Sequence, residues 1–518
     1  MHRKLIVLVV GLLMALQFLP GASSFNKGNS AGSQSDLCKS LPPVTAPTVG
    51  WQLPGDVPLI LDAPNANLFG WQQFIALNWE ADPNNPGQPL QSAPASSFGE
   101  PGDTDPVVWE SYKRDDEVFL SKAKKPAAWN APRAQRLIYS ISKFQGAPVL
   151  DLSEFGQAQV GNPWLTAQNG NLTFYEKRLN QDEFNYIVSN RLYDATVQNT
   201  VATTTGIHLP SGAAKSPSPN NCYATNSCGS IEIKAAWMPL GPNDNPAEFR
   251  KRYKTSLARV FNPATGRTGQ RVLVGLVGLH IIHKTANAQQ FIWATFEHID
   301  NTPDDNQLSN LPPGKKYAYY NPDCDPSKDP YQCQKNMLPT YCNPQNKCLN
   351  CSPSCPNKSC TPYSAPNQIV RIAAVPYNST NNVGCLNEAA WAAIKSVNPD
   401  SVFLNYRLIS VQWPGQSQTY TTPAQTPLTQ GNPQPQAYKV SNTTMETYVQ
   451  QALSCLDCHS FAQVAPLVAG KAPIKISKST SSGPGSKPAA DYSFLFLEAC
   501  TKTNNNGCPA SQTPCKQE

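Results

Sequence analysis

Apolar residues recur at helical spacing in some parts of the chain and form strand-like runs in others. Between Leu68 and Trp79, large apolar residues fall three or four positions apart, as one face of a helix requires. Similar patterns predict further helices over 108–123, 181–192, 246–261 and 388–395. Runs rich in β-branched and aromatic residues predict strands over 230–238, 269–284, 290–300 and 401–413.

These predicted elements do not alternate in the regular way that builds a doubly wound parallel sheet. We therefore expect an α+β fold, with a β-rich body that is either sandwich-like or otherwise layered, and with peripheral helices. Residues 285–288 separate two predicted strands and suit a hairpin turn.

The composition divides the chain into regions. Residues 25–60 have little periodicity and predict a flexible lead-in, the body spans 61–437, and a Gln-, Thr- and Pro-rich stretch over 414–436 leads into a C-terminal segment, 438–518. With 40% hydrophobic residues the chain can bury a sizeable core, and its 49 prolines predict many loops.

The first 24 residues have the pattern of a cleavable signal peptide. Basic residues at 2–4 precede an apolar stretch over 5–18, and Ala22-Ser23-Ser24 offers a peptidase site, so we expect cleavage after Ser24. An uncleaved anchor is the alternative, but the apolar stretch is shorter than the ~18–20 residues that span a bilayer. The sequence thus predicts an exported, periplasmic protein with no transmembrane segment after cleavage.

Cysteine usage agrees with export, because sixteen cysteines would be a liability in a reducing cytosol. Seven of them lie between Cys324 and Cys360, among residues too polar to build a core. We expect a disulfide-linked surface insertion, with Cys385 as a possible eighth member. A zinc site that uses Cys348 and Cys351 is the alternative.

The net charge of +6 (41 basic minus 35 acidic residues) falls to +4 (39 minus 35) when the signal, with Arg3 and Lys4, is removed. Basic residues are scattered and form no stripe or recognition motif, which excludes nucleic-acid binding. A field this weak gives no strong electrostatic docking patch for a partner protein.

The sequence Cys455-Leu456-Asp457-Cys458-His459 is a C-x-x-C-H motif, the attachment signature of c-type haem. Two thiols one helical turn apart can each form a thioether to a porphyrin vinyl group, and the next residue presents an imidazole to the iron. Residue frequencies predict about 0.006 chance occurrences in a chain of this composition. A Cys455–Cys458 disulfide and a zinc site are the rival interpretations.

The residues before the motif predict a helix that ends at the haem. Thr443 and Glu446 have capping-box spacing, and the apolar residues Met445, Tyr448, Ala452 and Leu456 would share one face.

No Met or His follows His459, so a sixth iron ligand has to come from the body, or the distal position is open. His280 and His298 are the first candidates, and His283, Met238 and Met337 are weaker ones. A turn centred near 286–287 leads us to expect His280 and His298 on one face of the strand pair and His283 on the other.

Four stretches, 71–79, 108–110, 292–301 and 442–459, together with 491–494, resemble a family of exported bacterial proteins known as cytochrome c family proteins, over most of residues 68–500. The resemblance implies one covalent haem c and electron transfer, without an established substrate. We therefore expect a periplasmic mono-haem cytochrome that passes single electrons to or from a redox partner protein. A haem enzyme of peroxidase or oxygenase type, with an open distal site in the large body, is the alternative.

Overall fold

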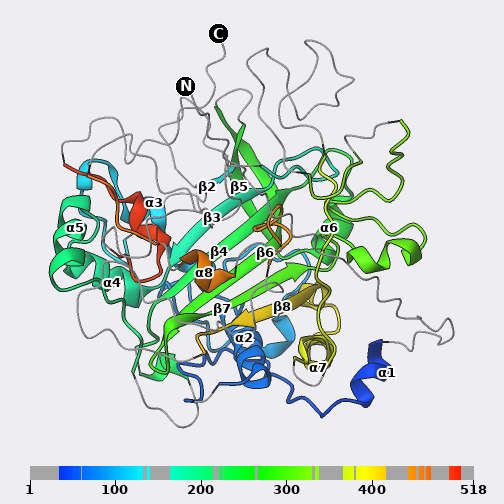
Figure 1. Ribbon diagram of the computed structural model, residues 1–518, viewed down its shortest axis with the longest axis horizontal. Helices are drawn as coiled ribbons and strands as arrows, with labels where there is room; N and C mark the ends of the chain where they lie inside the picture. The colour runs from blue at the N-terminus through cyan, green and yellow to red at the C-terminus, as the bar shows by residue number, and fades with distance from the viewer. Residues whose placement is uncertain are drawn as a thin grey trace, which may run out of the picture.

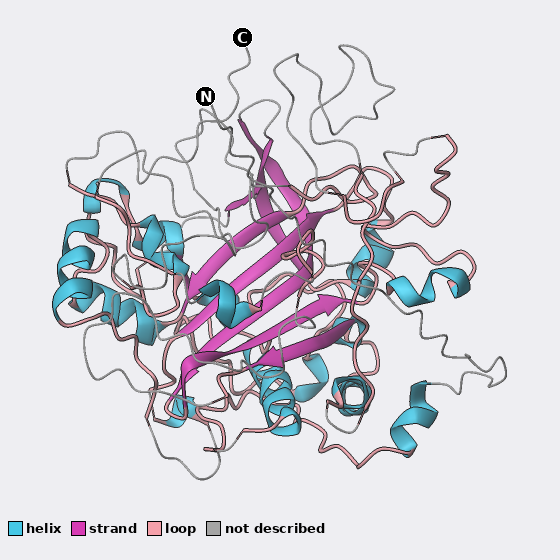
Figure 2. Cartoon of the chain, viewed as in Figure 1, coloured by secondary structure: helices cyan, strands magenta, loops and turns pink. Residues whose placement is uncertain are grey.

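The protein is described here from a computed structural model. The described residues are 34–59, 61–131, 137–140, 164–213, 221–225, 227–262, 267–328, 333–337, 366–378, 381–415, 441–450, 454–459, 462–467 and 489–502. Across these residues the chain forms one large twisted sheet with helices around it (Figures 1 and 2).

The sheet has eight strands and is antiparallel except where β2 pairs with β5. Its path runs β1-β3-β2-β5-β6-β7-β8, and β4 bridges β3 and β6. The strands are β1 (Lys113–Arg114), β2 (Leu137–Ser140), β3 (Phe174–Leu179), β4 (Ile231–Pro239), β5 (Thr255–Asn262), β6 (Arg267–Thr285), β7 (Ala288–His298) and β8 (Tyr406–Gln412). The long β6 is central, since it pairs with β4, β5 and β7.

Eight α-helices, most of them short, surround the sheet in the described part of the chain (Figure 1). They are α1 (Gln34–Lys39), α2 (Ala63–Leu77), α3 (Asp115–Val118), α4 (Gln181–Ser189), α5 (Ala195–Thr204), α6 (Pro246–Arg252), α7 (Val383–Val397) and α8 (Cys455–His459). The α+β prediction is confirmed. The described residues form one sheet, and no second sheet packs on it as a sandwich would require.

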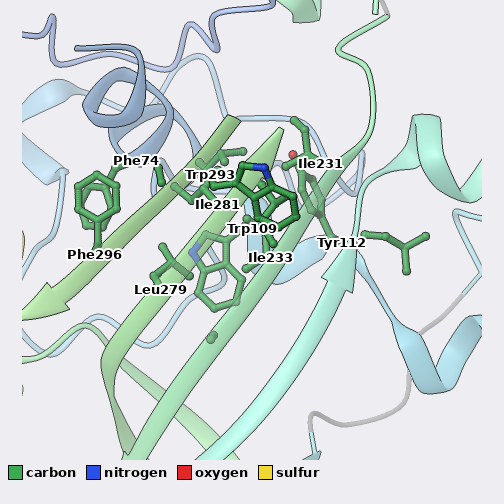
Figure 3. Close-up of a cluster of buried hydrophobic side chains, with 14 of the residues drawn as sticks. Phe74, Trp109, Tyr112, Ile231, Ile233, Leu279, Ile281, Trp293 and Phe296 are labelled. Atoms are coloured by element: carbon green, nitrogen blue, oxygen red, sulfur yellow. The ribbon is translucent and has the colours of Figure 1, made fainter. Parts of the chain in front are cut away.

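One face of the sheet is apolar and packs against α2. The Asp62 carboxylate accepts a hydrogen bond from the Asn65 amide and caps the first turn of α2. The Phe74 ring stacks on Phe296 of β7, with centroids 4.3 Å apart, and both lie in the buried cluster of Figure 3. Buried apolar contacts of this kind supply most of the stability of a helix–sheet layer.

The opposite face of the sheet is polar although it is also buried. Strand register places Lys234, His280 and Thr295 side by side on this face, because they are cross-strand partners. The C-terminal segments 441–450, 454–459 and 489–499 supply contacts to this face, and α8 lies over the middle of the sheet in Figure 1. Peptide and side-chain groups of these segments meet the polar groups that the sheet presents.

Several predicted elements are confirmed: the helix at 68–79 is α2, the helix at 181–192 contains α4, and the helix at 388–395 lies in α7. The strands at 230–238, 269–284 and 290–300 are β4, β6 and β7, and residues 285–288 form the hairpin turn between the last two. The predicted strand at 401–413 begins as a 3-10 turn, Val402–Asn405, before β8.

Two predicted helices are wrong. Residues 108–123 form a 3-10 turn (Val108–Ser111), the edge strand β1 and the one-turn helix α3, because their apolar residues are buried in separate contacts rather than along one stripe. Residues 246–261 are helical only in α6, and the following 255–262 is the β5 strand. Three basic residues end α6, and the β-branched and aromatic residues after them pair with β6.

Disulfides are described at Cys38–Cys385, Cys222–Cys228 and Cys324–Cys333. Cys385 therefore does not belong to the cysteine-rich insertion as predicted, since it ties α7 to α1. The insertion does contain the short Cys324–Cys333 loop. Its other five cysteines, and with them the zinc alternative at Cys348 and Cys351, lie outside the described residues.

The predicted signal peptide and the Gln- and Pro-rich stretch at 416–436 also lie outside the described residues. Within the described ranges, every helix is too short or too polar to cross a bilayer.

Gly278 tests how the C-terminal segment packs on the polar face. A Cβ at Gly278 would lie 2.3 Å from the Thr444 hydroxyl oxygen, a distance too short for any contact. We expect Gly278→Ala to lower the free energy of unfolding by about 1–3 kcal/mol and to speed proteolysis within 441–459, measured by urea unfolding and limited digestion.

The matched control is Gly70→Ala, whose Cβ would lie 2.7 Å from Val411 Cγ2, where α2 packs on the sheet. This variant should be destabilised without selective cleavage of the C-terminal segment. A Gly278→Ala protein with the stability and cleavage pattern of the wild type would contradict the packing described.

Candidate functional site

The C-x-x-C-H motif forms the helix α8, which packs on the polar face of the sheet. Its Leu456 amide donates to the Gln412 side-chain oxygen of β8 at 2.9 Å, and the Cys458 amide donates to the Ser454 carbonyl at 3.0 Å. Cys455 and Cys458 lie three positions apart in this single turn, and both are half-exposed. The geometry is therefore the helical turn that the motif predicted.

His459 ends α8 and is held by a backbone carbonyl. Its Nδ1 lies 2.8 Å from the carbonyl oxygen of Tyr492, and because a carbonyl can only accept, Nδ1 carries the hydrogen. The Trp293 and Phe494 rings flank the imidazole, with centroids 4.3 and 4.8 Å away. Nε2 of His459 is thus the nitrogen with a lone pair available to a metal.

The carbonyl that holds His459 belongs to a strained backbone turn. Asp491 and Tyr492 have φ values of +49° and +66°, in the left-handed region that residues with a Cβ seldom adopt. Each such residue costs on the order of 1–3 kcal/mol unless its surroundings hold it in place. Two in succession, beside the candidate site, indicate that the direction of the Tyr492 carbonyl is important.

The surroundings keep the imidazole of His459 neutral. The pKa of His459 is lowered to about 4, chiefly by burial, with smaller contributions from Lys234 and His280, while the Tyr492 carbonyl and Glu446 oppose the shift. A neutral imidazole is the form that ligates a metal.

His280 is the one of the two first distal candidates that the fold places on the same sheet face as His459. Its Nε2 lies 3.1 Å from the Glu446 carboxylate, whose second oxygen accepts a hydrogen bond from the Asn442 amide at 2.7 Å. Burial would raise the pKa of Glu446, but His280, the Asn442 amide and Lys234 outweigh it and hold that pKa below its ordinary value. The site thus contains a carboxylate–histidine pair beside a lysine.

His298 lies on the opposite face, so the prediction that it shares a face with His280 is wrong. His280 pairs with Thr295, and odd spacing along β7 sends His298 to the other side. The ring of His298 stacks on Tyr253 at 4.0 Å, its Nε2 lies 2.9 Å from the Arg252 carbonyl, and its Nδ1 accepts from the Asp300 amide. Both ring nitrogens serve the packing of that face.

His283 also lies away from α8. Its ring nitrogens contact the Gln73 side chain of α2 and the Cys228 carbonyl, at 2.8 and 2.6 Å. The hairpin contains a β-bulge between His283 and Thr285, and Phe291 opposite it has a positive φ of 65°. Thr285 pairs with Ala288 and His283 with Ile292, so this bulge shifts the pairing by two residues and leaves the faces unchanged. The prediction that His283 and His280 lie on opposite faces is confirmed, and only the face of His298 was assigned wrongly.

The helix predicted to lead into the motif is wrong over 443–450, where the chain makes irregular turns. Some of its polar groups bond to each other, and several bond to the body. The backbone amide of Thr443 donates to the Glu297 carboxylate, and the Tyr448 hydroxyl donates to the Trp164 carbonyl at 2.7 Å. The side-chain amide of Gln450 donates to the Val370 carbonyl at 2.9 Å. Tertiary hydrogen bonds therefore override a weak helical pattern.

A buried ion pair fixes this segment to the sheet. Arg371 bonds to the Glu297 carboxylate of β7 and donates to the Ser441 carbonyl at 3.0 Å, and both side chains are almost fully buried. The side-chain amide of Asn442 donates to the Thr295 hydroxyl and to the Phe296 carbonyl. These contacts set the height of residues 441–447 above the sheet.

A separate small cleft, about 30 Å³, lies between the loop 93–107 and the body. Lys254 borders it, but its ammonium group already contacts the Asp105 and Thr255 carbonyls and Glu110. This cleft is therefore a packing gap far in sequence from the motif. Among the described residues, no group of three or more His, Cys, Asp or Glu side chains comes together as a metal-binding cluster.

Sequence reasoning missed four partners of the motif, namely Gln412, Trp293, Tyr492 and Phe494, and it missed Glu446 as a partner of His280. Tyr492 acts through its carbonyl, which no side-chain pattern reveals. Trp293 could have been found, because correct register places it two positions from Thr295 on the His280 face.

Comparison with family models, with curated protein sequences and with solved structures finds no match for this chain. The functional interpretation therefore rests on the geometry of α8 and its surroundings.

That geometry fits a covalently bound haem. Two half-exposed thiols lie one turn apart, the next residue is a neutral imidazole whose Nδ1–H is already bonded, and aromatic rings flank it. The donor set of two Cys and one His with this spacing is the c-type attachment set.

The low pKa of His459 leads to a pH prediction for the cofactor-free chain. The unfolded chain protonates His459 near pH 6.5, but the folded chain does so only near 4, so stability falls as pH drops through this window. His459→Gln should remove this contribution and flatten the fall by up to ~1.4 kcal/mol per pH unit, measured by urea unfolding from pH 7 to 4.5. Equal slopes in both proteins would contradict the burial of the imidazole.

Proposed function

We propose that this chain is an exported mono-haem c-type cytochrome that carries single electrons. Cys455 and Cys458 would bind the haem as thioethers, and His459 would be the proximal iron ligand through Nε2. The observation that carries the proposal is the hydrogen bond from His459 Nδ1–H to the Tyr492 carbonyl beside the two motif cysteines. It leaves one defined nitrogen of a neutral imidazole for the metal.

A haem iron supplies reversible one-electron chemistry between ferrous and ferric states. The chain's own residues contribute the setting. The Tyr492 carbonyl orients the imidazole and increases its basicity, and the Trp293 and Phe494 rings restrict its rotation. The buried polar face keeps α8 in register with β8 through Gln412.

His280 is the candidate that we retain for the distal side, because it lies on the same sheet face as Trp293 and carries a bonded carboxylate partner. We no longer propose His298 for this role, since it packs against Tyr253 on the other face. The export signal and the oxidised cysteines are consistent with a periplasmic location, where c-type haem is attached.

Covalent haem attachment is the direct test. Expressed with cytochrome c maturation machinery, the wild type should show a pyridine haemochrome spectrum of a protein with two thioethers. Cys455→Ser or Cys458→Ser should shift the α-band to longer wavelength, because one vinyl group stays unreacted, and the double variant should lose covalent haem.

The control is Cys324→Ser, which removes a cysteine of the surface disulfide with Cys333 and should keep the wild-type spectrum. A wild-type protein that retains no haem after denaturation and acid–acetone extraction would end the proposal.

A haem enzyme is the second candidate, and the Glu446–His280 pair beside Lys234 is the observation that favours it. A carboxylate-bound histidine could move a proton at an open distal position instead of ligating iron. The two functions differ in whether the sixth position is closed.

Carbon monoxide binding separates the two functions. For a carrier with His280 as ligand, we expect a low-spin reduced protein that ignores carbon monoxide, and a His280→Ala variant that binds it. His298→Gln is the matched control and should behave as the wild type, since that residue lies on the other face. Rapid carbon monoxide binding by the wild type would show an open sixth position, which contradicts the electron-carrier function and supports the haem enzyme.

A further inference from the structure

Behind the Tyr492 carbonyl lies a buried ion pair that no part of the motif predicts. The ammonium group of Lys284, near the end of β6, bonds to the Asp491 carboxylate, and both side chains are at most 1% exposed. The same carboxylate oxygen accepts a hydrogen bond from the Leu209 amide at 2.7 Å. Asp491 is thus fastened both to the sheet and to the loop after α5.

Two other carboxyl groups, those of Glu183 and Glu232, also interact electrostatically with this region. Lys284 nevertheless forms its ion pair with Asp491. Burial raises the pKa of Glu183 well above its ordinary value and that of Glu232 to about 7, and each of the two groups also affects the other. Burial raises the pKa of Asp491 as well, and Lys284 and the Leu209 amide oppose that shift. The geometry identifies Asp491 as the partner of Lys284, because its Oδ2 is the carboxylate oxygen that both donors contact.

The ion pair holds the backbone that orients His459. Asp491 and Tyr492 are the two successive residues with positive φ, and a strained turn persists only where contacts hold it. The Lys284 and Leu209 contacts fix the side chain of the first of them, and the buried Tyr492 and Ser493 follow directly. The direction of the Tyr492 carbonyl therefore depends on the Asp491 anchor.

We propose that Lys284 and Asp491 are positioning residues for the proximal ligand: their buried ion pair holds the 491–492 turn so that the Tyr492 carbonyl accepts the His459 Nδ1 hydrogen. The effect of this ion pair on the iron depends on the proposed function, because it requires a bound haem. Its effect on the orientation of the His459 imidazole depends only on the contacts described above. Loss of the anchor lengthens the Nδ1–H···O bond, which makes the imidazole a weaker donor and disfavours the ferric state.

Three variants separate positioning from charge. Asp491→Asn removes the negative charge beside Lys284, Lys284→Met removes the positive charge beside Asp491, and the double variant changes no net charge. The electrostatic effects of the single variants on the reduction potential have opposite signs. Loss of the positioning contact, in contrast, lowers the iron–histidine stretching frequency in all three variants. It also raises the reduction potential of the double variant, in which the charge effects cancel.

The iron–histidine stretch is measured by resonance Raman on reduced, haem-loaded full-length protein that also carries His280→Ala, so that the iron is five-coordinate. The potential is measured by redox titration of haem-loaded full-length protein, and the ¹⁵N shift of the His459 side chain is measured in full-length chain produced without haem. We expect the double variant to lose the hydrogen-bonded Nδ1–H signal, with covalent haem content unchanged. Glu110→Gln is the control, because it breaks another buried ion pair, to Lys254 at 3.4 Å, and should move stability but neither signal.

The outcomes are distinct. A double variant with the wild-type ¹⁵N shift overturns the positioning role whether or not haem binds, and so does an unchanged iron–histidine frequency. If the double variant does not fold, the Asp491→Asn shift decides, because Asn keeps an acceptor for the Leu209 amide. A changed ¹⁵N shift in a chain that attaches no haem keeps the positioning role and ends the cytochrome proposal.

Discussion

The buried polar face of the sheet requires partners that only the C-terminal part of the chain supplies. A polar group taken out of water without a partner costs several times what a satisfied hydrogen bond contributes. On this face Thr295, Glu297 and Lys284 have partners from residues 442–443 and 491. The position of α8, and hence of the whole candidate site, follows from satisfying these groups.

The two faces of the sheet accordingly have different roles. The face that packs on α2 is close-packed with aromatic rings and provides stability mainly through apolar contacts. The polar face provides direction, because hydrogen bonds and ion pairs specify angles that apolar contacts do not. A ligand that has to meet a metal with one particular nitrogen is better supported by the second kind of surface.

Electrostatics and strain act together around His459. Burial and two neighbouring basic groups keep its imidazole neutral, and the strained 491–492 turn aims a carbonyl at its Nδ1. Neither feature stabilises the fold by itself. Each has a free-energy cost that the surrounding contacts offset. Costs of this kind are common for residues that a protein holds in place for a function.

Much of the local structure was determined by the sequence alone. The stripe of apolar residues in α2, the β6–β7 hairpin and the one-turn motif helix follow from spacing, since each is a short-range periodicity. The tertiary structure decided which face of the hairpin His298 occupies, because the pairing of His280 with Thr295 is set by packing across the strands and not by the periodicity of either strand. It also decided that 443–450 is not helical and that a backbone carbonyl 33 residues after His459 orients it. Contacts between distant parts of the chain depend on three-dimensional packing and leave no periodic trace in the sequence.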